Sequence, residues 1–247
     1  MIIDLHVITW NESDIIRLVL RHYKKFCRNL YVYDNHSTDN TREIAESEGA
    51  IVSLFGTKFF DDSENMKLKN TCWIGSDADW VIVCDADEIL SVVPGVIPNT
   101  DDTSLITGQL WFDLFMFGKS IIKTIGWQIM SDEMPKENIT EITNGYEFSN
   151  YAKSIAFSPK HIEAVNFNPG AHRCDPVGYV EFTKPILYVL HYKHIGGVQR
   201  TIDRYKVYQK RMSKYNRSKG HGVHYSQNER KLRAEWAERM AKSKPLI

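Results

Sequence analysis

Three acidic residues, Asp85, Asp87 and Glu88, come directly after the apolar segment 80–84. This segment is rich in β-forming residues, so we predict a buried strand that ends where the acids begin. Asp85 and Asp87 are two positions apart, and in extended backbone their side chains would point the same way. Carboxylates that close repel each other unless they share a proton or bind a cation. A solvated strand end or helix start is the alternative interpretation.

Ligands collect at the carboxyl ends of strands in α/β sheets, which favours the cation. Because carboxylate oxygens are hard ligands, we predict Mn²⁺ or Mg²⁺. His191 follows another apolar segment, 186–190, where an imidazole could complete the metal's shell and favour Mn²⁺. The sequence therefore predicts a metal site made of Asp85, Asp87 and His191.

Two residues in and after the turn-rich stretch 168–173 are candidates for proton transfer. His172 lies within it and Asp175 follows three positions later. A lone His is more often structural, but an imidazole or carboxylate near a reacting hydroxyl can act as a general base. Asp132 and Glu133, in a long polar segment, are the other candidates.

Two further acids follow earlier predicted strands. Asp34 ends the segment 30–33, where a carboxylate can accept hydrogen bonds from a nucleobase or a ribose hydroxyl. Glu12 follows the first strand and is predicted to lie beside Asp34, although a helix N-terminal acid would look the same.

The chain also contains residues that could bind a phosphate group near these carboxylates. Phosphate oxygens beside carboxylates need positive charge to offset the repulsion. Lys69 and Asn70 precede the acidic strand, and Lys153 and Lys193 come later. The alternative for each lysine is a solvated helix or strand face.

Strands and helices alternate through the first ninety residues. This order predicts an α/β fold with a mostly parallel, Rossmann-type central sheet flanked by helices. The predicted strands are 2–9, 30–33, 50–54 and 80–84, and the predicted helices are 15–26, 41–48 and 64–75.

The remainder predicts strands at 104–117, 121–130, 151–158 and 186–192, a loop at 131–146, and helices after Gly196 and Gly197 with a break at 220–222. We predict a domain over 1–195, made of two halves at 1–100 and 101–195. Residues 196–247 form a basic helical extension.

Composition is ordinary for a soluble globular protein of 247 residues, but charge is uneven. Residues 201–247 carry 13 Lys and Arg against four Asp and Glu, a net charge of +9 that the remainder balances. The basic extension suggests either an anionic partner, such as a membrane surface, or a solvated face packed on the acidic body. Four scattered cysteines and the lack of a long apolar run predict a cytoplasmic protein, and no nucleic-acid partner is expected.

Three blocks together resemble the family 2 glycosyltransferases of the GT-A fold, in their bacterial and viral branch. They are residues 7–12 (VITWNE), 32–39 (VYDNHSTD) and 80–88 (WVIVCDADE), and residues 170–172 and 190–193 resemble later features of that branch. The resemblance covers about residues 1–195, and it implies that the half 1–100 binds the nucleotide sugar and the half 101–195 the acceptor.

The resemblance implies an inverting transfer of a sugar from a nucleoside diphosphate to the hydroxyl of a glycan, lipid-linked or other acceptor, as in surface polysaccharide synthesis. It implies that Glu12 and Asp34 hold the nucleoside, that Asp85 lies near the ribose or metal, and that Asp87 and His191 bind the metal. The acidic pair that supplies the base in many members has no clean copy here.

Two rival functions stay open at this point. A metal-dependent sugar-phosphate nucleotidyltransferase would share the nucleotide-binding half, although residues 9–12 lack its glycine-rich loop. A non-catalytic module could keep the nucleotide pocket without turnover.

Overall fold

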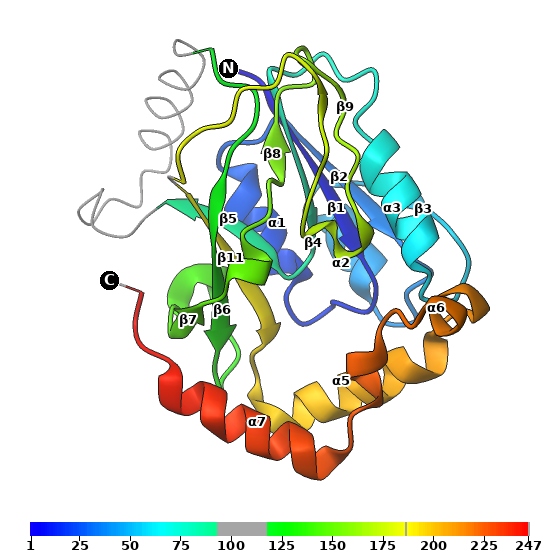
Figure 1. Cartoon of the computed structure of the whole chain (residues 1–247), viewed down its shortest axis with the longest axis vertical. Helices are drawn as coiled ribbons and strands as arrows, with labels where there is room; N and C mark the ends of the chain where they lie inside the picture. The colour runs from blue at the N-terminus through cyan, green and yellow to red at the C-terminus, as the bar shows by residue number, and fades with distance from the viewer. Residues whose placement is uncertain (93–117, 186, 247) are drawn as a thin grey trace.

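The computed structural model describes residues 1–92, 118–185 and 187–246. The first part alternates strand and helix: β1 Ile3–Thr9, α1 Ile16–Lys24, β2 Asn29–Asp34, α2 Thr41–Ser47, β3 Ile51–Leu54, α3 Asp62–Thr71 and β4 Trp80–Asp85 (Figure 1). These four strands pair in parallel in the order β3-β2-β1-β4, and the short β8 (Ala156–Phe157) adds an antiparallel edge. The predicted α/β class with a mostly parallel central sheet is confirmed.

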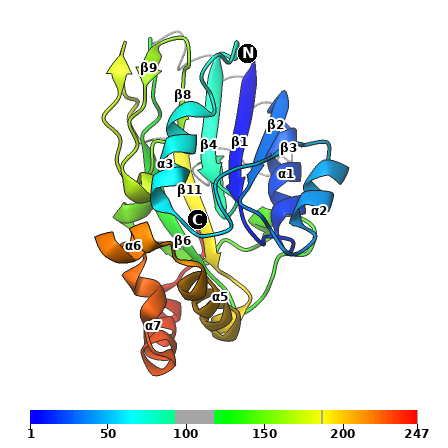
Figure 2. The ribbon, with the colours of Figure 1, turned by 90° about the vertical axis from the view of Figure 1, so that its right-hand side faces the viewer.

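Apolar residues cover both faces of this sheet, because alternate side chains of one strand point to opposite sides. On one face, Leu5 and Val7 of β1 belong to the same buried cluster as Leu20 of α1. On the other face, Val81 and Val83 of β4 pack in a second cluster together with side chains from α3. Figure 2 shows α3 on one side of the sheet and α1 and α2 on the other. The strand register brings Thr9, Asp34 and Asp85 to one edge of the sheet.

A second sheet has the order β5-β11-β6-β7, from β5 (Glu88–Val92), β11 (Leu187–His194), β6 (Thr124–Met130) and β7 (Gly145–Glu147). β11 is antiparallel to β5 and parallel to β6. A two-stranded ribbon, β9 (Ile162–Ala164) with β10 (Val177–Gly178), lies apart from it, and η3 Pro169–Ala171 lies between those two strands in the chain.

The structure corrects several predicted boundaries in this half. The acids do not end the strand region, because Asp85 closes β4 and a two-residue turn leads straight into β5. The predicted strand 151–158 is reduced to β8, preceded by the 3₁₀ turn η2 Ser149–Tyr151. The predicted loop 131–146 contains η1 Ile139–Glu141 and the start of β7. The predicted strand 104–117 lies outside the described residues.

The C-terminal segment is helical, as predicted, with α5 Gly197–Arg211, α6 Lys214–Lys219, η4 Val223–Ser226 and α7 Glu229–Lys242. Gly220 and Gly222 have φ of +70° and +69°, which favours glycine and produces the predicted break. These helices lie across the carboxyl ends of the strands at the bottom of Figure 1. Within the described residues, no helix combines the length and apolar character needed to cross a lipid bilayer.

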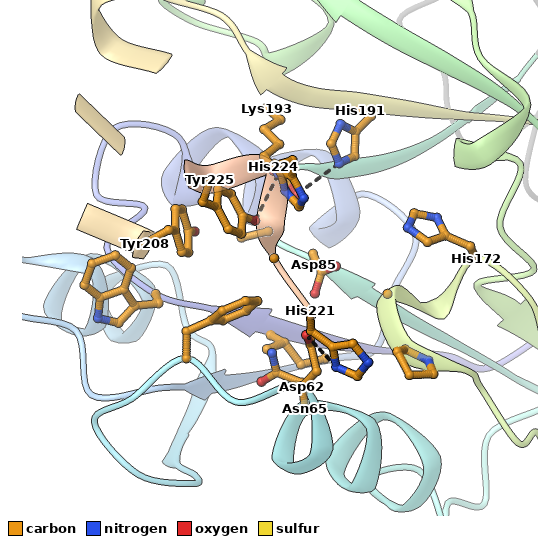
Figure 3. A pocket seen from close by; sticks show the side chains of 18 of the residues that line it. Asp62, Asn65, Asp85, His172, His191, Lys193, Tyr208, His221, His224 and Tyr225 are labelled. Atoms are coloured by element: carbon orange, nitrogen blue, oxygen red, sulfur yellow. Dashed lines mark hydrogen bonds and ion pairs between the residues drawn. The ribbon is translucent and has the colours of Figure 1, made fainter. Parts of the chain in front are cut away.

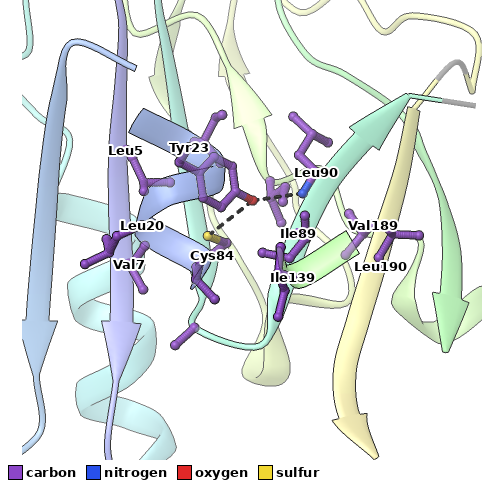
Figure 4. Close-up of a cluster of buried hydrophobic side chains, with 14 of the residues drawn as sticks. Leu5, Val7, Leu20, Tyr23, Cys84, Ile89, Leu90, Ile139, Val189 and Leu190 are labelled. Atoms are coloured by element: carbon purple, nitrogen blue, oxygen red, sulfur yellow. Dashed lines mark hydrogen bonds between the residues drawn. The ribbon is translucent and has the colours of Figure 1, made fainter. Parts of the chain in front are cut away.

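The buried hydroxyl of Tyr23 joins helix α1 to strand β5 (Figure 4). It donates to the carbonyl oxygen of Glu88 at 3.0 Å and accepts from the backbone N–H of Leu90 at 2.8 Å. Tyr23 is fully buried, so neither backbone group can turn to water instead. This link holds the strand that directly follows the acidic turn.

Replacing Tyr23 with Phe is therefore expected to lower the free energy of unfolding by about 2 kcal/mol, because two buried backbone groups lose a partner. Urea unfolding of the variant measures the loss. Tyr179→Phe, at a side chain that is 54% exposed, is the control and is expected to change stability little. Equal stability of the Tyr23 variant and the wild type would contradict this role.

Candidate functional site

A pocket of about 570 Å³ opens where the carboxyl ends of β1, β4 and β11 meet the C-terminal helices. Its volume is in the range of small-molecule sites. The body contributes Trp10, Asp85, Asp87 and His191 to the lining, and the C-terminal helices contribute side chains that include Tyr208 (Figure 3). Residues almost 200 positions apart in the chain thus face one cavity.

Asp85 is held by two lysines at the end of β4. Its carboxylate lies 2.7 Å from Nζ of Lys69 and 3.8 Å from Nζ of Lys153. Burial would raise the pKa of Asp85, but the two ammonium groups outweigh it and hold the pKa at about 2. Lys153 also pairs with Glu88, which is fully buried. The predicted cationic residues Lys69 and Lys153 therefore reach the acidic corner, and Asp85 is ionised with its charge offset.

Asp87 differs from Asp85 because no lysine or arginine pairs with it in the described part of the chain. It belongs to the turn 86–87, so the expectation that both aspartates share one side of an extended strand is wrong. Both nevertheless line the pocket. Oδ1 of Asp87 lies 3.9 Å from Nε2 of His191.

The protonation of His191 follows from its neighbour Gln128. The amide Nε2 of Gln128 donates to the backbone carbonyl oxygens of Ile129 at 2.6 Å and His191 at 3.0 Å. Its Oε1 must then face Nδ1 of His191, at 3.2 Å, and accept that hydrogen. Burial, followed by the charge of Lys153, lowers the pKa of His191 well below its usual value. The imidazole is therefore neutral, with an unprotonated Nε2.

Two acceptors, the Asp87 carboxylate and Nε2 of His191, thus face each other with no hydrogen between them. Such a pair suits a cation, and Tyr151 stacks on the imidazole with ring centres 3.9 Å apart, which fixes its direction. No group of three His, Cys, Asp or Glu side chains poised for a metal occurs among residues 1–92, 118–185 and 187–246. The arrangement therefore fits a metal that takes its other ligands from phosphate oxygens and water, as Mg²⁺ commonly does.

Three residues predicted to bind the nucleotide have other partners. Glu12 lines the pocket, but its carboxylate is paired with the guanidinium of Arg204, whose Nη1 is 2.8 Å from Oε2. Asp34 is fully buried, accepts from the backbone N–H of Ser37 at 2.8 Å and is not a lining residue. Asn70 bonds both backbone polar groups of Phe167, through Oδ1 at 2.7 Å and Nδ2 at 3.4 Å. Glu12 and Asn70 are thus engaged within the protein, whereas Oδ2 of Asp34 is buried without a hydrogen-bond partner among the described residues. Nucleotide binding by these three residues stays a prediction.

The two candidates for proton transfer separate in the structure. His172 lies at the pocket rim, and its Nδ1 is 2.6 Å from the carbonyl oxygen of Asn150. Asp175 is exposed and does not line the pocket. The structure therefore does not bring Asp175 to the pocket that holds Asp87 and His191. Asp132 and Glu133 are not lining residues either.

The sequence interpretation missed the lining residues of the C-terminal helices. Arg211 stacks on Trp10, with its guanidinium carbon 3.6 Å from the ring centre, and its Nη2 donates to Oδ1 of Asn35 at 2.7 Å. Tyr208 stacks on Tyr225 with ring centres 4.9 Å apart. The aromatic and arginine residues spaced three or four apart on α5 were the available signal.

No protein-family model matches the chain, and no curated protein matches it. Solved structures with similar coordinates include glucosyl-3-phosphoglycerate synthase from Mycobacterium tuberculosis in complex with Mn²⁺, UDP and glucosyl-3-phosphoglycerate. It has a TM-score of 0.35 and 20% identity over 51% of this chain and 44% of that one. The same enzyme with Mn²⁺, UDP-glucose and phosphoglyceric acid gives the same values.

Mannosyl-3-phosphoglycerate synthase from Rubrobacter xylanophilus also matches, with a TM-score of 0.35 and 17% identity over 53% of this chain and 41% of that one. The matched part spans less than half the length of each of these proteins.

Proposed function

We propose that the protein is a metal-dependent glycosyltransferase of the GT-A type, which moves a sugar from a nucleoside diphosphate to an acceptor hydroxyl with inversion. The observation that carries the proposal is the pair formed by Asp87 and the unprotonated Nε2 of His191, 3.9 Å apart beside two lysines. A site for a divalent cation next to fixed ammonium groups suits a diphosphate leaving group.

Trp10, Asn35 and Arg211 offer a place for the nucleoside at one end of the pocket. All three line it, and Arg211 Nη1 has no hydrogen-bond partner within the protein's described residues. The indole of Trp10 and the guanidinium over it form a flat, cationic wall. We propose this surface in place of the predicted contacts of Glu12, which is paired with Arg204, and of Asp34, which does not line the pocket.

Asp87 and His191 would hold Mn²⁺ or Mg²⁺, which supplies Lewis-acid stabilisation of the diphosphate when bound. Lys69 and Lys153 contribute fixed positive charge next to Asp85. Because these side chains are buried and already paired, they need little reorganisation as negative charge develops on the leaving group.

His172 is the proposed base. The carbonyl oxygen of Asn150 can only accept, so Nδ1 of His172 carries the hydrogen and Nε2 keeps its lone pair. Burial, followed by the charge of Lys153, lowers the pKa of His172, so the imidazole is neutral near neutral pH. The acceptor oxygen bonds to the anomeric carbon and its proton passes to Nε2. The bond to the diphosphate oxygen breaks on the opposite face, and the nucleoside diphosphate leaves with the electron pair.

A thermal-shift panel of UDP, GDP, ADP and CDP, each with and without Mn²⁺, tests the donor site. A ligand that binds only the folded state raises the melting temperature by mass action. We expect one nucleotide to give a shift that depends on Mn²⁺ and that the matching sugar nucleotide reproduces. No shift with any nucleotide would overturn the proposal.

Two further assays separate the rival functions. Formation of a sugar nucleotide from a nucleoside triphosphate and a sugar phosphate would favour the nucleotidyltransferase. Nucleotide binding without hydrolysis or transfer across a panel of hydroxyl acceptors would favour a non-catalytic module.

A further inference from the structure

Lys193 is a cation without a carboxylate partner at the other end of the pocket. Its Nζ donates to the phenol oxygen of Tyr225 at 3.0 Å and lies 4.7 and 5.5 Å from the ring centres of Tyr225 and Tyr205. In the described part of the chain it forms no ion pair. An ammonium group held among rings and a phenol has exchanged part of its hydration for weaker partners.

None of the carboxylates that line the pocket forms an ion pair with Lys193 among the described residues, and Asp87, which has no lysine or arginine partner, faces Nε2 of His191 instead. Glu12 is paired with Arg204, Asp85 with Lys69, and Asp62 lies 3.5 Å from His221. At this end the lining instead adds Arg239 and the imidazole of His224. Nη2 of Arg239 lies 3.0 Å from Oε2 of Glu235, one turn earlier on α7, so this ion pair offsets part of its charge. The charge of this end of the pocket is therefore positive and only partly offset.

Tyr225 completes a pair of hydrogen-bond donors. Its oxygen accepts from Lys193, so its own hydrogen is free to be donated into the pocket. Burial raises the pKa of Tyr225, which keeps the phenol protonated, and stacking on Tyr208 at 4.9 Å fixes the ring. Figure 3 shows Lys193, Tyr225 and His224 side by side.

Lys193 is also close to the proposed reaction centre. It lies two residues beyond His191 on β11, and in extended backbone such residues are about 6–7 Å apart. A group bound by Lys193 would therefore lie within one small molecule's length of the metal pair, but away from the Trp10 end.

We propose that Lys193 and Tyr225 bind an oxyanion, a phosphate or carboxylate group, carried by the sugar acceptor. The inference rests on the proposed function, and it names the acceptor class as a small anionic hydroxy compound. The ammonium supplies charge and the phenol a directed hydrogen bond, and together they place the acceptor hydroxyl between the donor sugar and His172.

The test uses the full-length protein with saturating nucleoside diphosphate and Mg²⁺, which fills the donor subsite and, being diamagnetic, does not broaden nearby NMR resonances. Inorganic phosphate and glycerate are the two probes, and they distinguish a phosphate from a carboxylate. Binding is followed by the NMR resonance of the His224 Cε1 hydrogen, a reporter that lines this end of the pocket.

We expect saturable binding of at least one probe, a loss of about tenfold or more in affinity for Lys193→Gln, and partial recovery for Lys193→Arg. One lost charge-assisted hydrogen bond of ~1.5–3 kcal/mol corresponds to about that factor. Tyr225→Phe is expected to weaken binding less. Lys206→Gln, at an exposed lysine on α5, is the matched control.

Equal affinity in the wild type and Lys193→Gln, or no saturable shift with either probe, would overturn the inference. The nucleotide thermal shift of Lys193→Gln separates this failure from that of the proposed function. An unchanged nucleotide shift with no anion binding removes only the anionic acceptor, whereas the lack of any nucleotide shift in the wild type removes the donor site.

Discussion

Asp87→Asn is expected to reduce turnover by about 10²- to 10⁴-fold while the protein stays folded. The amide keeps the shape of the side chain but removes the charge that faces Nε2 of His191. Loss of a metal's charge stabilisation costs several kcal/mol, and each 1.36 kcal/mol is a factor of about ten in rate. The measurement is initial rate with the sugar nucleotide identified by the thermal-shift panel.

Circular dichroism and the melting temperature of the same variant show whether the fold is intact. Asp203→Asn, at an exposed carboxylate on α5, is the matched control and is expected to retain full activity. The thermal-shift measurements with and without Mn²⁺ add a second readout. The Mn²⁺-dependent part of the rise in melting temperature caused by the nucleotide should vanish in Asp87→Asn. A folded variant with wild-type turnover would remove Asp87 from the mechanism.

Lys153→Met is expected to cost about 3–5 kcal/mol of stability at neutral pH, because it leaves the carboxylate of Glu88 buried without its cation. Lys153 is itself 3% exposed, so water cannot easily replace it. Urea unfolding measures the loss. Lys160→Met removes the exposed ion pair with Asp79 and is expected to cost about 1 kcal/mol or less.

The double variant Glu88→Gln with Lys153→Met distinguishes charge from packing. Glutamine keeps an acceptor for the backbone N–H of Asp85, which lies 3.1 Å from Glu88 Oε2. If the uncompensated charge causes the loss, the double variant should recover most of the stability. If it stays as unstable as Lys153→Met alone, the lysine acts through packing rather than through charge.

The parallel sheet was predictable because its strands and helices are each specified locally. β1 alternates apolar residues with Asp4 and His6 and is buried along its whole length, and α1 repeats its apolar residues at helical spacing. Strand β5 was not predictable, since it begins with Glu88, a charged residue directly after Asp87. What permits a carboxylate at a buried strand start is Lys153, which follows it by 65 residues.

The two residues of the proposed metal pair were predictable, but their geometry was not. Asp87 and His191 each follow an apolar strand segment, which the sequence displays directly. The turn at 86–87, which separates the orientations of Asp85 and Asp87, depends on the pairing of β5 with β11. Glu12 and Asp34 stand at the predicted strand ends, yet Arg204 pairs with Glu12 and the N–H of Ser37 bonds Oδ1 of Asp34. Oδ2 of Asp34 is buried without a hydrogen-bond partner among the described residues. Such partners are set by tertiary contacts.

The basic extension illustrates the same limit. Its excess of lysine and arginine was compatible with two predictions, binding to an external anionic partner or packing on the acidic body of the same chain. Arg204 pairs with Glu12, and Arg200 lies 3.0 Å from Asp14, so part of the charge is used within the protein. The division into a domain 1–195 and an extension remains a prediction, although side chains from both parts line one pocket.

That shared lining has a consequence for biosynthesis. Chains grow from the amino terminus, and domains tend to fold as they emerge. The parallel sheet can form early, but the Arg211 guanidinium that covers Trp10 is made some 200 residues later. Until then the ribosome-bound chain would expose the indole of Trp10, and the carboxylate of Glu12 would lack its partner Arg204. The pocket is thus completed only after residues 197–211 of α5 have been made and have packed against the sheet.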